Sequence, residues 1–208
     1  MKKIIAIVLA ASSLFFLTVS SALAEWTVGL SVAHGVYEAE GSETQEGDNE
    51  KNYASEEETF SYPSIFVEYN IGSVSVGLDI LPGSVETEEQ ARTDYNTVDT
   101  GNDGGGTSPG VTNKVSVEVS RHVSLYGILP IMDTGAYIKA GISTMDVETQ
   151  ESLDTGATYG DKGGVAGEHL SLGYQHDTDN GFVRLEVGYS AYDKIKATSN
   201  IGHVVDVD

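Results

Sequence analysis

Residues 112–147 contain the clearest periodic pattern in the chain. Apolar and polar side chains alternate up to residue 126, and the alternation resumes at Ile138 after a break at residues 130–135. Successive side chains of a β-strand point to opposite faces, so this pattern predicts two amphipathic strands joined by a short turn. The apolar parity consists of Val115, Val117, Val119, Val123, Leu125, Ile138, Ala140 and Ile142.

The same alternation predicts seven strands in all. They are residues 26–33, 59–70, 74–80, 112–126, 138–143, 165–176 and 183–190. The longer ones have about the ten residues with which a tilted strand crosses a bilayer. The pattern therefore predicts an all-β chain.

Long and short connections alternate strictly between these strands. The long ones are residues 38–58, 84–111 and 146–164 and the segment from residue 193, and the short turns are residues 70–72, 130–135 and 177–181. We expect the long segments to be solvated polar loops, because they are rich in acidic residues. Such alternation is typical of outer-membrane barrels, whereas soluble sandwiches have turns of mixed length at both ends.

Full charges occur on the polar parity of the predicted strands. They are Glu68, Asp79, Glu118, Lys139, Arg184 and Glu186. In the core of a soluble sheet, each would cost several kcal/mol unless it were paired. In a hydrated barrel lumen, the charges can pair with one another while the apolar parity faces lipid. The pattern therefore favours an up-and-down antiparallel transmembrane β-barrel over a soluble sheet.

The first 24 residues are predicted to be a cleavable secretory signal. Lys2 and Lys3 precede an apolar run, and Ala22 and Ala24 stand at the minus-three and minus-one positions of a cleavage site. Serine and threonine interrupt the run, which makes it too short for a membrane anchor. We therefore expect two parts, a signal peptide at residues 1–24 and a barrel domain at residues 25–208.

The composition restricts the partners. The formal net charge is −21 and becomes −23 once Lys2 and Lys3 leave with the signal. This charge argues against nucleic-acid binding, because phosphates need basic partners. It favours divalent cations at the acidic loops, by diffuse condensation rather than at a specific site. The chain has no cysteine, so an exported form needs a core, a closed sheet or a bound metal for stability.

In its signal, strand length and loop alternation, the chain resembles the small eight-stranded outer-membrane barrels of Gram-negative bacteria, the OmpA-transmembrane, OmpX and OmpW-like porin superfamily. Residues 129–141 (LPIMDTGAYIKAG) also resemble a stretch of uncharacterised barrel proteins from marine bacteria. The resemblance implies location in the cell outer membrane, contact with lipid and lipopolysaccharide, and insertion by the barrel assembly machinery. It also implies eight strands, so we expect the last strand to be missing from this sequence.

Two sets of residues are candidate sites. The predicted lumen charge network consists of Glu68, Glu118, Lys139, Arg184 and Glu186, and the predicted interface aromatics are Trp26, Tyr69, Tyr137, Tyr174 and Tyr189. The charge network either gates a narrow pore or fills a closed barrel. We favour filling, since an eight-stranded barrel is only just wide enough for side chains. Arg121 has the lipid-facing parity, which predicts either snorkelling to the headgroups or a bulge that resets the parity.

Evidence for other chemistry is weak. His122 and Ser124 invite comparison with the His-x-Ser pair of outer-membrane lipid A deacylases, but they have lumen parity and no third member is identifiable. His34, His169, His176 and His203 have no metal-binding spacing. The glycines from Gly101 to Gly106 only faintly match calcium-binding repeats. We therefore expect no catalytic residues, no metal site and no cofactor.

The sequence leaves three functions open. The first is a non-catalytic outer-membrane barrel whose acidic loops have a structural or surface-interaction role. The second is a narrow porin-like channel for ions or small solutes, and the third is an outer-membrane lipid-modifying enzyme. The first is preferred because Phe66, Tyr126 and the charged pairs are expected to fill the lumen.

Overall fold

The computed structural model describes residues 4–8, 25–44, 51–94, 111–153, 156, 158–179 and 181–207. The described part of the chain forms twelve strands: β1 (Ile4–Val8), β2 (Trp26–Thr44), β3 (Lys51–Ile71), β4 (Val74–Ile80), β5 (Ser84–Glu86), β6 (Gln90–Asp94), β7 (Val111–Pro130), β8 (Ala136–Ser152), β9 (Lys162–Thr178), β10 (Gly181–Tyr192), β11 (Ile195–Thr198) and β12 (Val204–Val207). No helix long and apolar enough to cross a bilayer occurs in this part.

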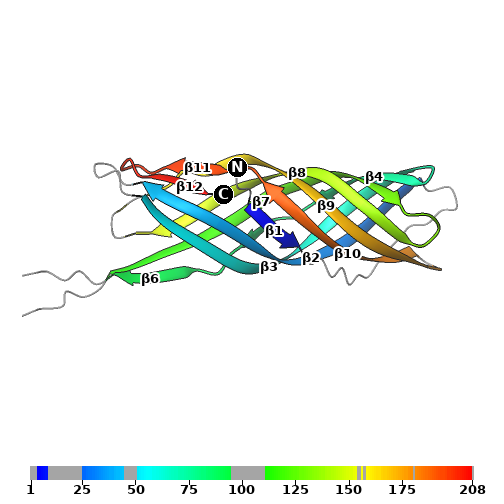
Figure 1. Ribbon diagram of the computed structural model, residues 1–208, viewed down its shortest axis with the longest axis horizontal. Coiled ribbons are helices and arrows are strands. Elements are labelled where there is room, and N and C mark those ends of the chain that lie inside the picture. The colour runs from blue at the N-terminus through cyan, green and yellow to red at the C-terminus, as the bar shows by residue number, and fades with distance from the viewer. Residues whose placement is uncertain are drawn as a thin grey trace, which may run out of the picture.

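The strands form one antiparallel sheet with up-and-down topology. Its order is β1-β10-β9-β8-β7-β4-β3-β2-β12-β11, with β5 and β6 also paired to β7. The sheet curls into an elongated shape with strongly tilted strands (Figure 1), and β6, β11 and β12 lie at the end opposite the short turns. Strand β1 pairs with both β10 and β2. The prediction of an all-β, antiparallel up-and-down fold is therefore confirmed.

Each of the seven predicted strands lies within an observed one, but several strands are much longer than predicted. Strands β2 and β3 pair continuously from Trp26–Tyr69 to Thr44–Lys51. Much of the predicted loop at residues 38–58 is therefore strand, and the same correction applies to parts of the other three long loops, which contain β5, β6, the end of β8, β11 and β12. Hairpins that are solvated on both faces need no apolar parity, so their acidic composition resembled that of a loop. The Gly101–Gly106 glycines lie outside the described residues.

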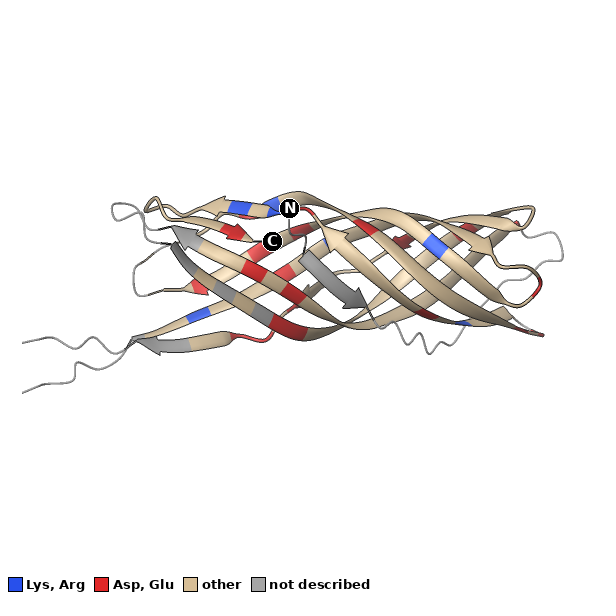
Figure 2. Ribbon diagram, in the orientation of Figure 1, with Lys and Arg blue, Asp and Glu red and all other residues tan. Residues whose placement is uncertain are grey.

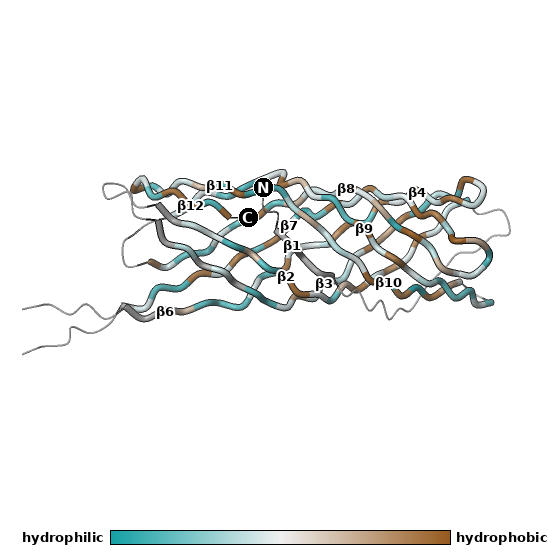
Figure 3. Tube along the Cα trace, in the orientation of Figure 1, coloured by the Kyte–Doolittle hydropathy of each residue, from teal (hydrophilic) through white to brown (hydrophobic). Residues whose placement is uncertain are grey.

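The distribution of polarity is the reverse of a soluble core. Along the half of the strands nearest the short turns, large apolar side chains are exposed, including Leu30, Leu78, Leu172 and Leu185. The most buried large side chain is instead that of Glu68, with 1% exposure. Figure 3 shows hydrophobic residues concentrated towards the short-turn end, and Figure 2 shows acidic residues mainly at the opposite end. We call the exposed apolar zone the apolar belt.

A β-bulge in β7 marks the margin of this belt that lies away from the short turns. Pairing with β8 shifts register between Ser120 and Val123, and Arg121 has a φ of 50°, in the left-handed region. The Arg121 side chain is exposed and forms an ion pair with Asp146. Of the two alternatives for Arg121, snorkelling and a bulge that resets the parity, the structure shows the bulge. One extra residue reverses which parity faces inward, because side chains alternate with period two.

Candidate functional site: a charged cluster inside the sheet

An ion pair between β3 and β10 forms the centre of the interior. Arg184 Nη1 lies 2.5 Å from Glu68 Oε1, and the two side chains are 11% and 0% exposed. The Tyr126 hydroxyl donates to the same carboxylate oxygen at 2.8 Å. The Arg184 Nε–H also donates to Gln175 Oε1 at 2.7 Å. These contacts compensate the burial of Oε1, whereas Glu68 Oε2 is buried without a hydrogen-bond partner among the described residues.

A second ion pair lies beside the first. Lys139 Nζ is 3.3 Å from Glu186 Oε2, and the Tyr137 hydroxyl donates to Glu186 Oε1 at 2.6 Å. The Lys139 ammonium also lies 4.1 Å from the centre of the Tyr126 ring. Since Tyr126 contacts both Lys139 and Glu68, the two ion pairs form one cluster contributed by β3, β7, β8 and β10.

Aromatic rings surround the Arg184 guanidinium. Its central carbon lies 4.3 Å from the centre of the Phe182 ring, 5.4 Å from that of Tyr137 and 5.9 Å from that of Phe66. A guanidinium over aromatic faces gains cation–π attraction and loses little to dehydration. The Arg184 side chain is therefore held by the carboxylate of Glu68 and by three aromatic rings near its guanidinium.

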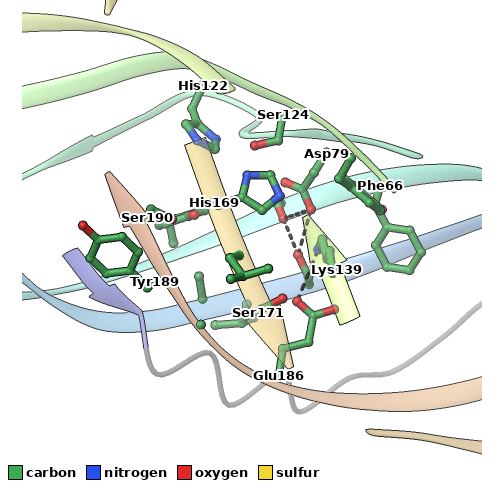
Figure 4. A pocket seen from close by; sticks show the side chains of 18 of the residues that line it. Phe66, Asp79, His122, Ser124, Lys139, His169, Ser171, Glu186, Tyr189 and Ser190 are labelled. Atoms are coloured by element: carbon green, nitrogen blue, oxygen red, sulfur yellow. Dashed lines mark hydrogen bonds and ion pairs between the residues drawn. The ribbon is translucent and has the colours of Figure 1, made fainter. Parts of the chain in front are cut away.

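The cluster separates two cavities. A cavity of about 120 Å³ lies on the long-strand side and is lined by residues including Asp79, His122, Lys139 and Arg184. A second cavity, of about 290 Å³, lies on the short-turn side and is lined by residues including Asn70, Tyr137 and Arg184. Arg184 lines both, so its side chain stands between them. Figure 4 shows the polar side chains that converge on the first cavity.

Asp79 is the acidic group of the first cavity. Ser64 Oγ donates to Asp79 Oδ2 at 3.0 Å and Ser31 Oγ at 3.4 Å, and the two hydroxyls are also hydrogen-bonded to each other. Its charge and parity were evident in the sequence, but Asp79 was not included in the predicted network. Asp79 lies on β4, which pairs with β3, the strand of Glu68, and with β7, the strand of Ser124. Its position between these two strands is the signal that could have identified it.

Glycines on neighbouring strands make room for the interior tyrosines. Tyr126 is paired with Gly77, and Tyr137 with Gly173. A Cβ added at Gly77 would come within 2.5 Å of the Tyr126 ring, and one at Gly173 would overlap the Tyr137 ring. Each ring therefore occupies the space that a side chain at its partner glycine would fill, and its hydroxyl reaches a carboxylate, that of Glu68 or Glu186. The sequence analysis missed this role.

Glu118 lies outside the cluster, in contrast to the prediction. Its carboxylate accepts a hydrogen bond from Gln150 Nε2 at 3.1 Å. Its cross-strand partners are Glu86 and Glu148, which are exposed. Paired residues share a face of the sheet, so Glu118 faces the same side as these two. The bulge at Arg121 explains why the prediction for Glu118 was wrong, because its extra residue reverses which parity faces inward on the Glu118 side of the bulge. The remaining four predicted residues, Glu68, Lys139, Arg184 and Glu186, come together.

The predicted interface aromatics occupy two different environments. Trp26 and Tyr174 are 62% and 53% exposed near the short turns, and Tyr189 is 39% exposed further along β10. Tyr69 lies against Trp26, with ring centres 4.8 Å apart. Tyr137 does not belong to the interface as predicted, because its side chain is only 3% exposed and faces the interior. Its parity is that of Lys139, so the alternation itself placed it on the inner face.

His122 and Ser124 face the first cavity. Ser124 is paired with Asp79 across β4 and β7, but the hydrogen bonds of Asp79 come from Ser31 and Ser64. His122 Nε2 lies 3.3 Å from the Tyr192 hydroxyl. These contacts do not form the linked nucleophile, base and carboxylate of a hydrolase. Within the described residues, no group of three or more His, Cys, Asp or Glu is placed to hold a metal ion.

No family model, curated protein or solved structure matches this chain. The function must therefore be inferred from the geometry of the fold and its interior.

Proposed function

We propose that this protein is a non-catalytic outer-membrane β-barrel with a filled interior and a structural or surface-interaction role. The observation that supports it best is the reversed polarity: exposed leucine, valine and isoleucine surround a buried Glu68–Arg184 pair. In water, such an apolar surface would cost about 25 cal/mol per Å². In a bilayer the same surface is solvated by lipid chains, and the polar groups are sheltered inside.

The apolar belt is continuous across neighbouring strands. On β2 the outward apolar residues run from Trp26 to Val32, and their partners on β3 run from Tyr69 to Pro63. In outer-membrane barrels the outward apolar side chains form one continuous lipid-facing band, which is usually flanked by aromatic residues. Trp26, Tyr69 and Tyr174 stand at the short-turn margin, where interfacial aromatics belong.

In this proposal the complete barrel has eight strands, seven of which are the strands predicted from residues 25–208, and the acidic extensions project outside the cell. Short turns face the periplasm in such barrels, and the longer connections face outward. The acidic ends of β2, β3 and β8 lie beyond the belt on the side opposite the short turns (Figure 2). This surface would meet lipopolysaccharide and its divalent cations, and the barrel assembly machinery would insert the chain.

Folding into lipid provides the test. The chain is refolded into phosphatidylcholine vesicles, digested with protease and analysed by electrophoresis with and without heating. We expect protection of the belt segments, cleavage within the extensions and a heat-dependent shift in mobility. A chain that remains soluble without detergent, with a cooperative unfolding transition and no binding to vesicles, would contradict the membrane assignment.

A narrow channel is the second candidate, because two cavities meet at Arg184. If the Glu68–Arg184 pair opened, the cavities would join into one polar path. Single-channel recordings in planar bilayers separate the two candidates. A filled barrel gives no sustained openings, whereas a gated channel gives discrete openings whose frequency rises in Glu68→Gln, where the carboxylate charge is removed.

A further inference from the structure

Asp79 is the one carboxylate of the interior cluster and its first cavity that forms no ion pair within the described part of the chain. The carboxylate of Glu186 is paired with the Lys139 ammonium. That of Glu68 is paired with the Arg184 guanidinium. These five side chains supply three carboxylates and two cations, so one negative charge has no counter-ion. A charge inside the sheet is unfavourable without a partner, which makes the space beside Asp79 a place for a cation.

The Asp79 carboxylate has one oxygen available to such a cation. Both of its hydrogen bonds, from Ser31 and Ser64, go to Oδ2. Its Oδ1 accepts no hydrogen bond from the residues that the structure describes. The two neutral hydroxyls therefore satisfy one side of the carboxylate, and a donor that enters the cavity can bind the other.

Further polar atoms without partners border the same cavity. His122 is only 7% exposed, and its Nδ1 is buried without a hydrogen-bond partner. His169 Nε2 and Ser171 Oγ are also buried without partners. All three residues line the cavity, and Figure 4 shows both imidazoles pointing into the space that Asp79 borders. A neutral imidazole has one nitrogen that accepts a hydrogen bond, so these atoms add acceptors for N–H donors.

A row of aromatic rings leads to this cavity from the long-strand end. The ring centres of Tyr37 and Phe60 are 6.4 Å apart, and those of Phe60 and Tyr62 are 5.8 Å apart. The Tyr62 ring is in turn 5.8 Å from that of His122, at the cavity wall. Ring faces attract organic cations, and the acidic extensions beyond the row raise the local concentration of cations. This route therefore favours solutes that are positively charged and partly apolar.

The fold already holds an ammonium group in this way. Lys139 Nζ lies 3.3 Å from a Glu186 carboxylate oxygen and 4.1 Å from the centre of the Tyr126 ring. Asp79 and Tyr62 offer the same two groups on another wall of the cavity. An inorganic ion fits less well, because calcium takes six to eight oxygen ligands and no group of three His, Cys, Asp or Glu in the described ranges is placed to hold a metal.

We propose that the cavity beside Asp79 binds a small primary alkylammonium ion, which enters from the long-strand end along the aromatic row. The ammonium donates hydrogen bonds to Asp79 Oδ1 and to the unpartnered acceptors, and the alkyl group lies against the rings. The cavity of about 120 Å³ is large enough, since one water needs only about 10–15 Å³ of such volume. The inference goes beyond the structural role and rests on the proposed barrel for its enclosed interior.

Saturation-transfer NMR with ethylammonium chloride tests the site. The full chain is refolded into micelles of a deuterated zwitterionic detergent, in sodium chloride at physiological ionic strength, where the Debye length is about 8 Å. Irradiation of the aromatic protons should transfer saturation to the ethyl group of the bound cation, and methylammonium should compete with it. Ethanol, a neutral probe of similar size, should show transfer at least about tenfold weaker, because charge-assisted hydrogen bonds are the stronger ones.

Two variants that remove the same charge at different places are the matched pair. Asp79→Asn preserves the shape of the side chain at the cavity, and Glu57→Gln changes an exposed position on β3. Diffuse attraction of cations to the chain is equal in both. We expect transfer to ethylammonium to be at least about tenfold weaker in Asp79→Asn and unchanged in Glu57→Gln. Without amine, Asp79→Asn should raise the urea midpoint, because the unpaired charge is gone.

Other outcomes overturn the proposal. Equal transfer in the two variants shows diffuse attraction only, and equal transfer to ethanol shows that the cavity does not select charge. A lower urea midpoint in Asp79→Asn shows that a neighbouring side chain already compensates the carboxylate. Displacement of the amine by phosphatidylethanolamine assigns the site to a lipid headgroup. If the parent gives no transfer but retains its heat-dependent mobility shift, the amine site alone is wrong. If the shift is also absent, the barrel proposal fails with it.

Discussion

At the scale of single residues, the interior depends on two buried ion pairs, Glu68–Arg184 and Lys139–Glu186. Glu68 accepts hydrogen bonds from Arg184 and Tyr126, and both ion-pair side chains are almost inaccessible to solvent. Such a pair adds little net stability compared with apolar residues of similar volume, but removal of one partner leaves an uncompensated charge. The Glu68–Arg184 pair is therefore sensitive to single substitutions and tolerant of paired ones.

We predict that Glu68→Ala lowers the free energy of unfolding by about 3–5 kcal/mol, because it leaves Arg184 buried without its counter-ion. Urea titration of the vesicle-inserted protein measures the change. Glu57→Ala, at an exposed position on the same strand, should change it by no more than about 0.5 kcal/mol. The double variant Glu68→Met, Arg184→Met should recover most of the loss. A single variant as stable as the parent would show that the interior is freely hydrated.

The tyrosine–glycine pairs lead to a second prediction at this scale. Gly173→Ala should destabilise the protein by about 1–3 kcal/mol, since the added methyl group overlaps the Tyr137 ring. Gly160→Ala is the matched control, because no atom lies within 4 Å of a Cβ at that position. Adding Tyr137→Ala to the first variant should remove the overlap, so the two effects should be non-additive. Additive effects in denaturant titrations would refute the packing argument.

At the scale of strands, local alternation predicted much but not all of the structure. Period two is a local property, so all seven predicted segments lie within strands. The acidic extensions were missed because a solvated hairpin needs no apolar face. Tyr137 was placed at the interface although its parity matched Lys139. The contact between Glu68 and Arg184 joins residues 116 positions apart, and it depends on the tilt and register of several strands, which no local pattern contains.

The bulge at Arg121 leads to a prediction for β7. Deletion of Arg121 should restore uninterrupted alternation and turn Glu118 towards the interior. Because the chain has no cysteine, a single Glu118→Cys substitution reports this change through its rate of maleimide labelling. We expect fast labelling in the parent and slow labelling after the deletion, with the reverse for Val119→Cys. Unchanged rates would show that the bulge does not set the parity.

At the scale of the whole molecule, solvent determines which face is stable. An apolar belt around a charged interior is stable in lipid and unfavourable in water. A charge on the outward face of the belt therefore has opposite consequences in the two environments. In lipid it costs free energy, and on a soluble sheet it would improve solubility without loss of stability.

We predict that Leu185→Arg lowers the free energy of unfolding from vesicles by about 2–4 kcal/mol, the cost of a basic residue near the bilayer midplane on a barrel surface. Leu185 is 60% exposed on β10 within the belt. The matched control is Ser55→Arg, at an exposed position on β3 beyond the belt, where the cost should be about 0–1 kcal/mol. Urea titrations of both variants measure the difference. If Leu185→Arg were instead neutral and made the chain soluble without detergent, the apolar belt would not face lipid, and the membrane assignment would be wrong.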